Sequence, residues 1–134
     1  GYCPTHAKIL ADDIIARKKE HPQAKVMAHP ECRPEVIALA DAVLSTSGMI
    51  KYAKESDAKE FIVGTEAGMV YRLEKDNPGK KFYPASPLAV CPNMKTITLE
   101  KVLWALEDMK YAVMVPEPTA SRARVAIERL LAIS

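Results

Sequence analysis

Short apolar runs alternate with segments of helical pattern between residues 10 and 83, and this alternation constrains the fold most. Helical segments are expected at residues 10–22, 34–41, 48–55 and 68–77, and the apolar runs cover residues 25–28, 42–44, 60–63 and 81–83. Strands separated by helices are typical of βαβ units with a parallel sheet. We therefore expect an α/β fold with a four-stranded parallel sheet flanked by helices.

The remaining residues continue the helical pattern after a loop. The loop contains "SPLAVCPNMK" and is followed by an expected helix at residues 99–110, a short apolar piece at 112–115 and a last helix after Pro118. The chain of 134 residues has the usual size of one domain. It starts at Gly1 without an initiator methionine, which we interpret as a cut edge.

Charge and cysteine content argue against several classes of partner. The 19 basic and 17 acidic residues give a net charge of +2 and are mixed along the chain, so nucleic acid is not an expected partner. No apolar run approaches the length of a membrane span, so we expect a soluble protein. Three cysteines are too few and too scattered for a disulfide framework. They indicate a reduced, intracellular setting, with metal binding as the alternative.

Polar residues follow every predicted strand. Because the carboxyl ends of parallel strands lie at one end of the sheet, these residues are expected to converge on a ligand site. The motif "STSG" at a helix start also offers hydroxyls and free backbone N–H groups, which suit a carboxylate or a phosphate. In strand order, the residues are His29, Pro30, Glu31 and Cys32, then Ser45, Thr46, Ser47 and Gly48, then Gly64, Thr65 and Glu66, and then Ser86 and the loop of Cys91.

Each of these motifs also has a purely structural interpretation. The serines of "STSG" can be helix caps, and "HPE" can be an exposed turn. Cys32 can be a small buried hydrophobic residue, and "GTEAG" is only half of several phosphate loops. The convergence of all four loops favours a functional site over four separate structural roles.

Five motifs together resemble the quinolinate synthase family, the iron–sulfur enzymes of bacterial and archaeal NAD biosynthesis. They are "GYCPTH", "HPEC", "STSGMIKYAKES", "EFIVGTEAG" and "CPNMK", in this order and with this spacing. The resemblance covers the C-terminal part of a longer family chain that is built of three similar α/β/α domains. It implies a three-layer α/β/α sandwich at residues 11–115, the end of a preceding domain at 1–10 and a C-terminal helix at 116–134.

The resemblance also implies a reaction and a cofactor. Members of the family condense iminoaspartate with dihydroxyacetone phosphate to quinolinate in the cytoplasm. Their [4Fe-4S] cluster has three cysteine ligands, one per domain, and an open iron that acts as a Lewis acid. Cys3 and Cys91 match two of these ligands, whereas Cys32 matches none. The third ligand would lie upstream, which leaves open whether this chain alone holds a cluster.

The same resemblance assigns roles to the polar residues. His29 and Thr46 match residues that hold a substrate carboxylate, with Ser45 and Ser47 helping from the same helix start. Glu31 matches a proton-transfer residue, so Glu31 and His29 are the expected catalytic pair. His6 is expected to line the same cavity. Without the N-terminal domains, the chain is expected to be inactive and to self-associate through an exposed apolar face.

Two other functional classes remain open at this stage. One is a zinc-binding domain that uses Cys3, His6 and either Cys32 or Cys91, although no second close pair of ligands completes that set. The other is a phosphate- or nucleotide-binding domain built on "STSG" and "GTEAG", which lacks a P-loop or a GxGxxG motif.

Overall fold

The structure, a computed structural model, describes residues 3–133 and divides the chain into two compact units. The first unit is Gly1–Met94 and the second is Lys95–Ser134. Gly1, interpreted above as a cut edge, lies outside the described residues. The division expected at residue 115 falls inside the second unit, and the domain limits given above stay a prediction.

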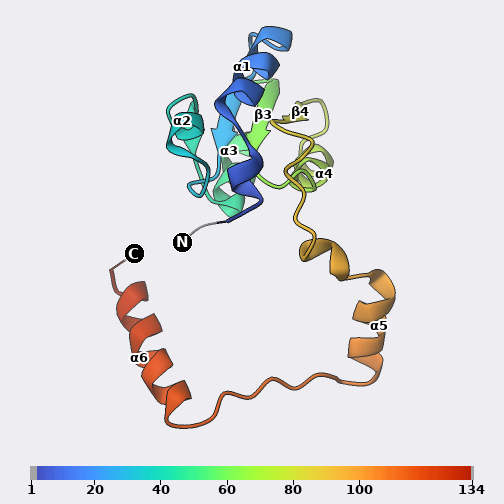
Figure 1. The fold of residues 1–134 in the computed structure, drawn as a ribbon. Coiled ribbons are helices and arrows are strands. Elements are labelled where there is room, and N and C mark those ends of the chain that lie inside the picture. The colour runs from blue at the N-terminus through green and yellow to red at the C-terminus, as the bar shows by residue number, and fades with distance from the viewer. Residues whose placement is uncertain (1–2, 134) are drawn as a thin grey trace. The chain divides into compact units, whose positions relative to one another are not determined.

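The first unit contains one parallel sheet, as expected from the sequence (Figure 1). Its strand order is β2-β1-β3-β4, and every neighbouring pair is parallel. Val26 pairs with Ile62 in the centre of the sheet, and Ile62 pairs in turn with Tyr83. The strands are β1 (Lys25–Ala28), β2 (Ala42–Val43), β3 (Glu60–Gly64) and β4 (Lys81–Pro84).

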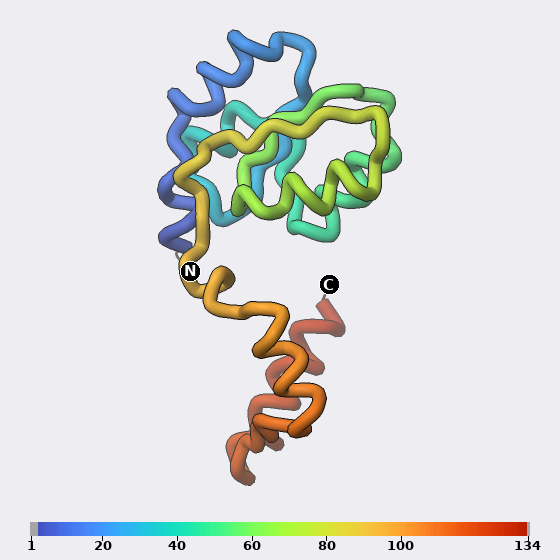
Figure 2. The backbone as a smooth tube through the Cα atoms, turned by 90° about the vertical axis from the view of Figure 1, so that its right-hand side faces the viewer, coloured from blue at the N-terminus to red at the C-terminus, as the bar shows by residue number. Residues whose placement is uncertain are grey.

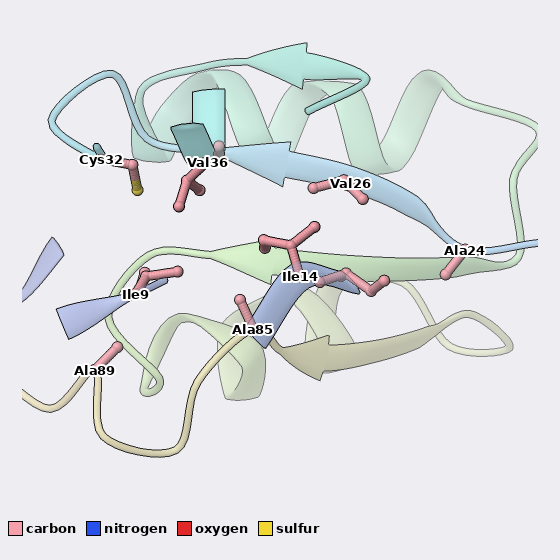
Figure 3. Packing of buried hydrophobic residues seen from close by; sticks show 10 residues of the cluster. Ile9, Ile14, Ala24, Val26, Cys32, Val36, Ala85 and Ala89 are labelled. Atoms are coloured by element: carbon pink, nitrogen blue, oxygen red, sulfur yellow. The ribbon is translucent and has the colours of Figure 1, made fainter. Parts of the chain in front are cut away.

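Helices cover both faces of this sheet, which confirms the three-layer arrangement. They are α1 (Ala11–Glu20), α2 (Pro34–Ile37), α3 (Thr46–Glu55) and α4 (Met69–Asp76). Successive residues of a strand point to opposite faces. Val26 accordingly packs with Ile14 of α1 and Val36 of α2 in one core cluster (Figure 3). Met27 belongs to a second cluster, in which Met49 of α3 and Leu73 of α4 take part.

The helices differ from their expected limits by one to four residues, and for α2 and α3 the local reason is visible. Helix α2 ends at Ile37 because the chain turns into β2, where the backbone N–H of Asp41 donates to the carbonyl of Val26 at 2.9 Å. Helix α3 begins two residues earlier than expected. Its N-cap is Ser45, whose hydroxyl accepts the N–H of Gly48 at 3.2 Å.

The second unit contains two helices, α5 (Leu99–Glu107) and α6 (Thr119–Leu131) (orange and red in Figure 2). Both begin where the sequence predicts, and α5 ends three residues before its expected limit. The hydroxyl of Thr98 caps α5 by accepting the N–H of Lys101. Residues 112–115 are neither helix nor strand. A membrane span would need a longer and more apolar helix than any in the described residues.

Candidate functional site

The connections of the sheet diverge between β1 and β3. The chain leaves β1 toward β2 on one side, and it leaves β3 toward β4 on the other side. Ligands of open α/β sheets bind at such a point, outside the carboxyl ends of the strands. His29 follows β1 here, Thr65 follows β3, and the N–H of His29 donates to the carbonyl of Gly64 at 2.9 Å. The parallel pairing confirms that His29, Thr46 and Glu66 share one end of the sheet.

The two central strands come very close at this point because residue 64 has no side chain. A Cβ atom at Gly64 would lie 3.1 Å from the carbonyl oxygen of Met27 and 3.3 Å from the Cα atom of Ala28. Glycine therefore lets the loops after β1 and β3 start side by side.

His6 joins this pair of loops from the N-terminal segment. It begins the short 3₁₀ helix η1 (His6–Lys8) and is 8% exposed. Its Nε2 atom lies 2.9 Å from the hydroxyl oxygen of Thr65, and its Nδ1 atom lies 3.0 Å from Oε2 of Glu31. The thiol of Cys3 completes a group in which the donor atoms of Cys3, His6 and Glu31 all lie within 4.8 Å of one another.

His29 stacks on His6, with ring centroids 4.3 Å apart and an angle of 3° between the ring planes. The Nδ1 atom of His29 accepts the backbone N–H of Glu31 at 3.2 Å. An imidazole nitrogen that accepts a hydrogen bond carries no proton, so Nε2 of His29 is the N–H donor in this arrangement. Burial and then His29 lower the pKa of His6, while Glu31 opposes them in part, so the neutral form of His6 is favoured.

All three cysteines are free thiols, and their surroundings differ. Cys32 is buried, and its thiol donates to the carbonyl of Gly64 at 3.2 Å. Burial raises the pKa of Cys32 to about 11. By contrast, the N–H of Met94 lowers the pKa of Cys91 against an opposing effect of burial, and the Thr5 hydroxyl adds to the lowering. Cys3 and Cys91 are both partly exposed.

Glu66 connects two loops at the same end of the sheet. Its carboxylate accepts the N–H of Gly68 at 2.8 Å and the N–H of Cys91 at 3.3 Å. Glu66 is 8% exposed. It therefore fixes the position of the Cys91 backbone relative to the loop after β3.

The hydroxyls of "STSG" act first as helix caps, which is the structural interpretation given above. Ser45 caps α3, and its hydroxyl oxygen also lies 3.2 Å from that of Ser47. The N–H of Leu44 donates to the carbonyl of Ala28 at 2.9 Å, which places the start of α3 beside the end of β1. Ser45, Thr46 and Ser47 are exposed there, and a role in substrate binding stays a prediction.

Thr65 makes a contact in the site that the sequence does not predict. The sequence places Thr65 after the third apolar run and indicates no role for it. Its hydroxyl bonds a residue 59 positions away in the chain, and both side chains are buried. The available signal was its place directly after β3, at the same end of the sheet as His29. As a whole, the site offers a carboxylate, two imidazoles and a thiol, which can hold a cation or transfer a proton.

Comparison with known proteins gives consistent matches over the whole chain. Residues 1–132 match the family described as "Quinolinate synthetase A protein". Proteins named quinolinate synthase are 53% identical in Thermodesulfovibrio yellowstonii and Methanosarcina barkeri, over 133 residues and 99% of this chain. One from Dehalococcoides mccartyi is 56% identical over 134 residues and 100% of this chain. The chain spans only 44% of the length of each of these relatives.

Proposed function

Because the chain belongs to the quinolinate synthetase A family, we propose that it forms one part of an active site that makes quinolinate for NAD biosynthesis. The substrates proposed are iminoaspartate and dihydroxyacetone phosphate. The observation that carries the proposal is the convergence of Cys3, His6, His29 and Glu31 where the connections of the sheet diverge. Since the chain spans 44% of the relatives' length, we assign catalysis to the longer protein and expect this chain alone to be inactive.

In this proposal, Glu31 and His29 are the catalytic residues. The side chain of Glu31 is 45% exposed, so a substrate can reach it, and a carboxylate there can accept and return protons during condensation and dehydration. The backbone N–H of Glu31 orients His29 with Nε2–H as a donor, which suits a substrate carboxylate. Thr46, with Ser45 and Ser47, adds hydroxyl donors from the start of α3, and His6 lines the same site.

The proposed cofactor is a [4Fe-4S] cluster held by Cys3, Cys91 and one thiolate from outside this chain. The donors fit this group because both thiols are free and partly exposed. The hydroxyl of Thr5, two residues from Cys3, also bonds the Cys91 thiol, which brings both thiols into one neighbourhood. When bound, such a cluster supplies a Lewis-acidic iron with an open coordination position.

The proposed partners are the remaining N-terminal domains of the longer protein, which the length of the relatives supports. The apolar side chains exposed on the second unit make self-association of the isolated chain a further expectation. Free thiols fit a reducing compartment, and we propose the cytoplasm as the location.

The test compares four substitutions in the longer, cluster-loaded protein. Cys3→Ser and Cys91→Ser should lose iron, visible absorbance and quinolinate formation, because each removes a ligand. Glu31→Gln should keep the iron and the absorbance but lower turnover by at least about 100-fold, since it removes the proton-transfer group.

Cys32→Ser is the matched control, because it removes a thiol of the same region that is no ligand in this proposal. It should retain the cluster and most of the activity. Loss of the cluster in Cys32→Ser together with its retention in Cys91→Ser would overturn the ligand assignment. Full turnover in Glu31→Gln would remove Glu31 from the mechanism.

A further inference from the structure

The loop after β3, residues 64–68, contacts both chain segments that carry a proposed cluster ligand, although it holds no cysteine itself. The hydroxyl oxygen of Thr65 lies 2.9 Å from Nε2 of His6, in the N-terminal ligand segment. The carboxylate of Glu66, the next residue, accepts the backbone N–H of Cys91 at 3.3 Å. Two neighbouring residues thus join two ligand segments that are far apart in the sequence.

On the N-terminal side, a contact that holds His6 also holds Cys3. The two residues belong to one turn, in which the N–H of Ala7 donates to the carbonyl of Cys3 at 3.0 Å. The side chains of His6 and Thr65 are both buried, which shields their contact from competing water. The Nε atom of Arg33 donates to the carbonyl of Ala7 at 2.9 Å and holds the turn at a second point. The position of the Cys3 turn therefore depends in part on the hydroxyl of Thr65.

On the other side, the loop holds the backbone of the Cys91 segment at two points. The Oε2 atom of Glu66 accepts the N–H of Gly68 at 2.8 Å, which fixes the carboxylate, and Oε1 accepts the N–H of Cys91. The N–H of Ala67 donates to the carbonyl of Ala89 at 2.8 Å. The Cys91 backbone therefore follows the position of the loop.

The loop is itself anchored where it leaves the sheet. The carbonyl of Gly64 accepts the N–H of His29 at 2.9 Å and the thiol of Cys32 at 3.2 Å. The Cα atoms of consecutive residues are about 3.8 Å apart. Because Thr65 and Glu66 are adjacent, their contacts hold the two ligand segments at a spacing that a single peptide unit fixes.

We propose that Thr65 and Glu66 are positioning residues that set the spacing between the thiols of Cys3 and Cys91. This inference rests on the proposed function, because it takes these thiols as the two cluster ligands of this chain. In this role neither Thr65 nor Glu66 is a ligand, and each acts through the backbone of a ligand segment. Hydrogen-bonding partners of metal ligands contribute about 10- to 100-fold to metal affinity when they are substituted.

The first test measures the thiol spacing in the reduced, metal-free chain of 134 residues. Cys32→Ser serves as the background, so that Cys3 and Cys91 are the two remaining thiols. The probe is dibromobimane, which becomes fluorescent when it links two thiols. Each linking rate is divided by the alkylation rate with monobromobimane, which removes differences in thiol reactivity. The background chain should link Cys3 to Cys91 within one molecule.

Thr65→Val and Glu66→Ala should each lower the normalised linking rate severalfold, because each removes a contact to one ligand segment. Thr65→Ser keeps the hydroxyl and should link as fast as the background chain. Glu66→Gln keeps one carbonyl acceptor and should give an intermediate rate. Leu73→Ala is the control for a general loss of stability, because Leu73 is fully buried in the second core cluster. It should leave the normalised linking rate unchanged.

The second test follows iron loss to a chelator in the longer, cluster-loaded protein by visible absorbance. Thr65→Val and Glu66→Ala should weaken iron retention by about 10- to 100-fold relative to Thr65→Ser. Unchanged iron retention in both variants would overturn the inference. So would a background chain that does not link its thiols, or linking rates that fall as far in Leu73→Ala as in Thr65→Val. The linking assay uses no cluster and no substrate, so its failure is distinct from a failure of the proposed function, which appears as absent quinolinate formation by the loaded wild type.

Discussion

The two units of the chain use similar apolar side chains in opposite ways. In the first unit, Phe61 and Ile62 are fully buried within the sheet. In the second unit, Leu103 is 51% exposed and Trp104 is 58% exposed, and no residue between 95 and 133 is buried. Both units form their helices where the sequence predicts them. The helical pattern predicts the positions of α5 and α6, and a side-chain N-cap is present at α5 but not at α6. The surface that buries their apolar side chains is a separate requirement.

The largest expected effect comes from a matched pair of truncations, one in each unit. Phe61→Ala should lower the free energy of unfolding by about 3–5 kcal/mol, because Phe61 is fully buried and stacks on Phe82 at 5.2 Å. Leu103→Ala should change it by no more than about 0.5 kcal/mol, as for other exposed positions. Urea unfolding followed by circular dichroism measures both, and equal losses would refute the contrast between the units.

A second prediction tests whether the Cys32 thiol, which lies beside the candidate site of the first unit, is shielded from solvent. Burial raises the pKa of Cys32 to about 11, two pH units above the ordinary value of 9.0, so its thiolate fraction near neutral pH falls about 100-fold. Alkylation of Cys32 should be slower than that of Cys91 by at least this factor and should accelerate as the pH rises toward 11. In urea the three thiols should react alike. Equal rates in the folded chain would contradict the burial.

A third prediction concerns the exposed apolar side chains of the second unit. Replacing Leu103 and Leu130 together with serine should reduce the binding of a hydrophobic dye severalfold, because both side chains are more than half exposed. Lys101→Ser, at an exposed polar position of α5, should leave dye fluorescence unchanged. Sedimentation of the same variants reports on self-association. Unaltered dye binding in the double variant would mean that the apolar surface lies elsewhere.

The smallest expected effect is a pH dependence of the folding stability that comes from Asp41. Burial raises the pKa of Asp41, but the ammonium of Lys25 and the N–H of Val26 outweigh it, so the pKa is lowered overall. A lowered pKa stabilises the fold above the ordinary value of 3.8, and this contribution disappears as the pH falls through the folded-state pKa. Wild type should therefore exceed Asp41→Asn in stability near neutral pH, and the difference should vanish in acid.

The control for this effect is Lys25→Met, which removes the ammonium group whose Nζ atom lies 2.8 Å from Oδ1 of Asp41. The pH dependence of folding stability should become smaller in Lys25→Met, as in Asp41→Asn. Urea midpoints measured across the acid range test both variants. A difference between wild type and Asp41→Asn that stays constant with pH would exclude the assigned interaction.

The sheet was predictable because its strands are short apolar runs at regular spacing, and the two central strands β1 and β3 are mostly buried on both faces. The limits of helices were less predictable. Helix α2 ends early because Asp41 bonds the backbone of β1, a contact between residues that are 15 positions apart. Such tertiary contacts leave no trace in a local pattern.

The candidate site was predictable only in part, for the same reason. Strand order and direction place His29 and Glu31 at the correct end of the sheet. The contact between His6 and Thr65 depends on how the N-terminal segment folds back, which spacing does not encode. Spacing suggested Cys32 or Cys91 as the residue beside Cys3 and His6, whereas the structure brings the carboxylate of Glu31 within 4.8 Å of their donor atoms.

The edge strands of the sheet limit how copies of this chain can associate. Strand β2 has only two residues, and β4 begins with Lys81 and ends with Pro84, which lacks a backbone N–H donor. Short strands, lysine and proline at an edge discourage the pairing of strands between molecules. We therefore expect copies of this chain to associate through their helices rather than through paired edge strands, and not to form a cross-β fibre.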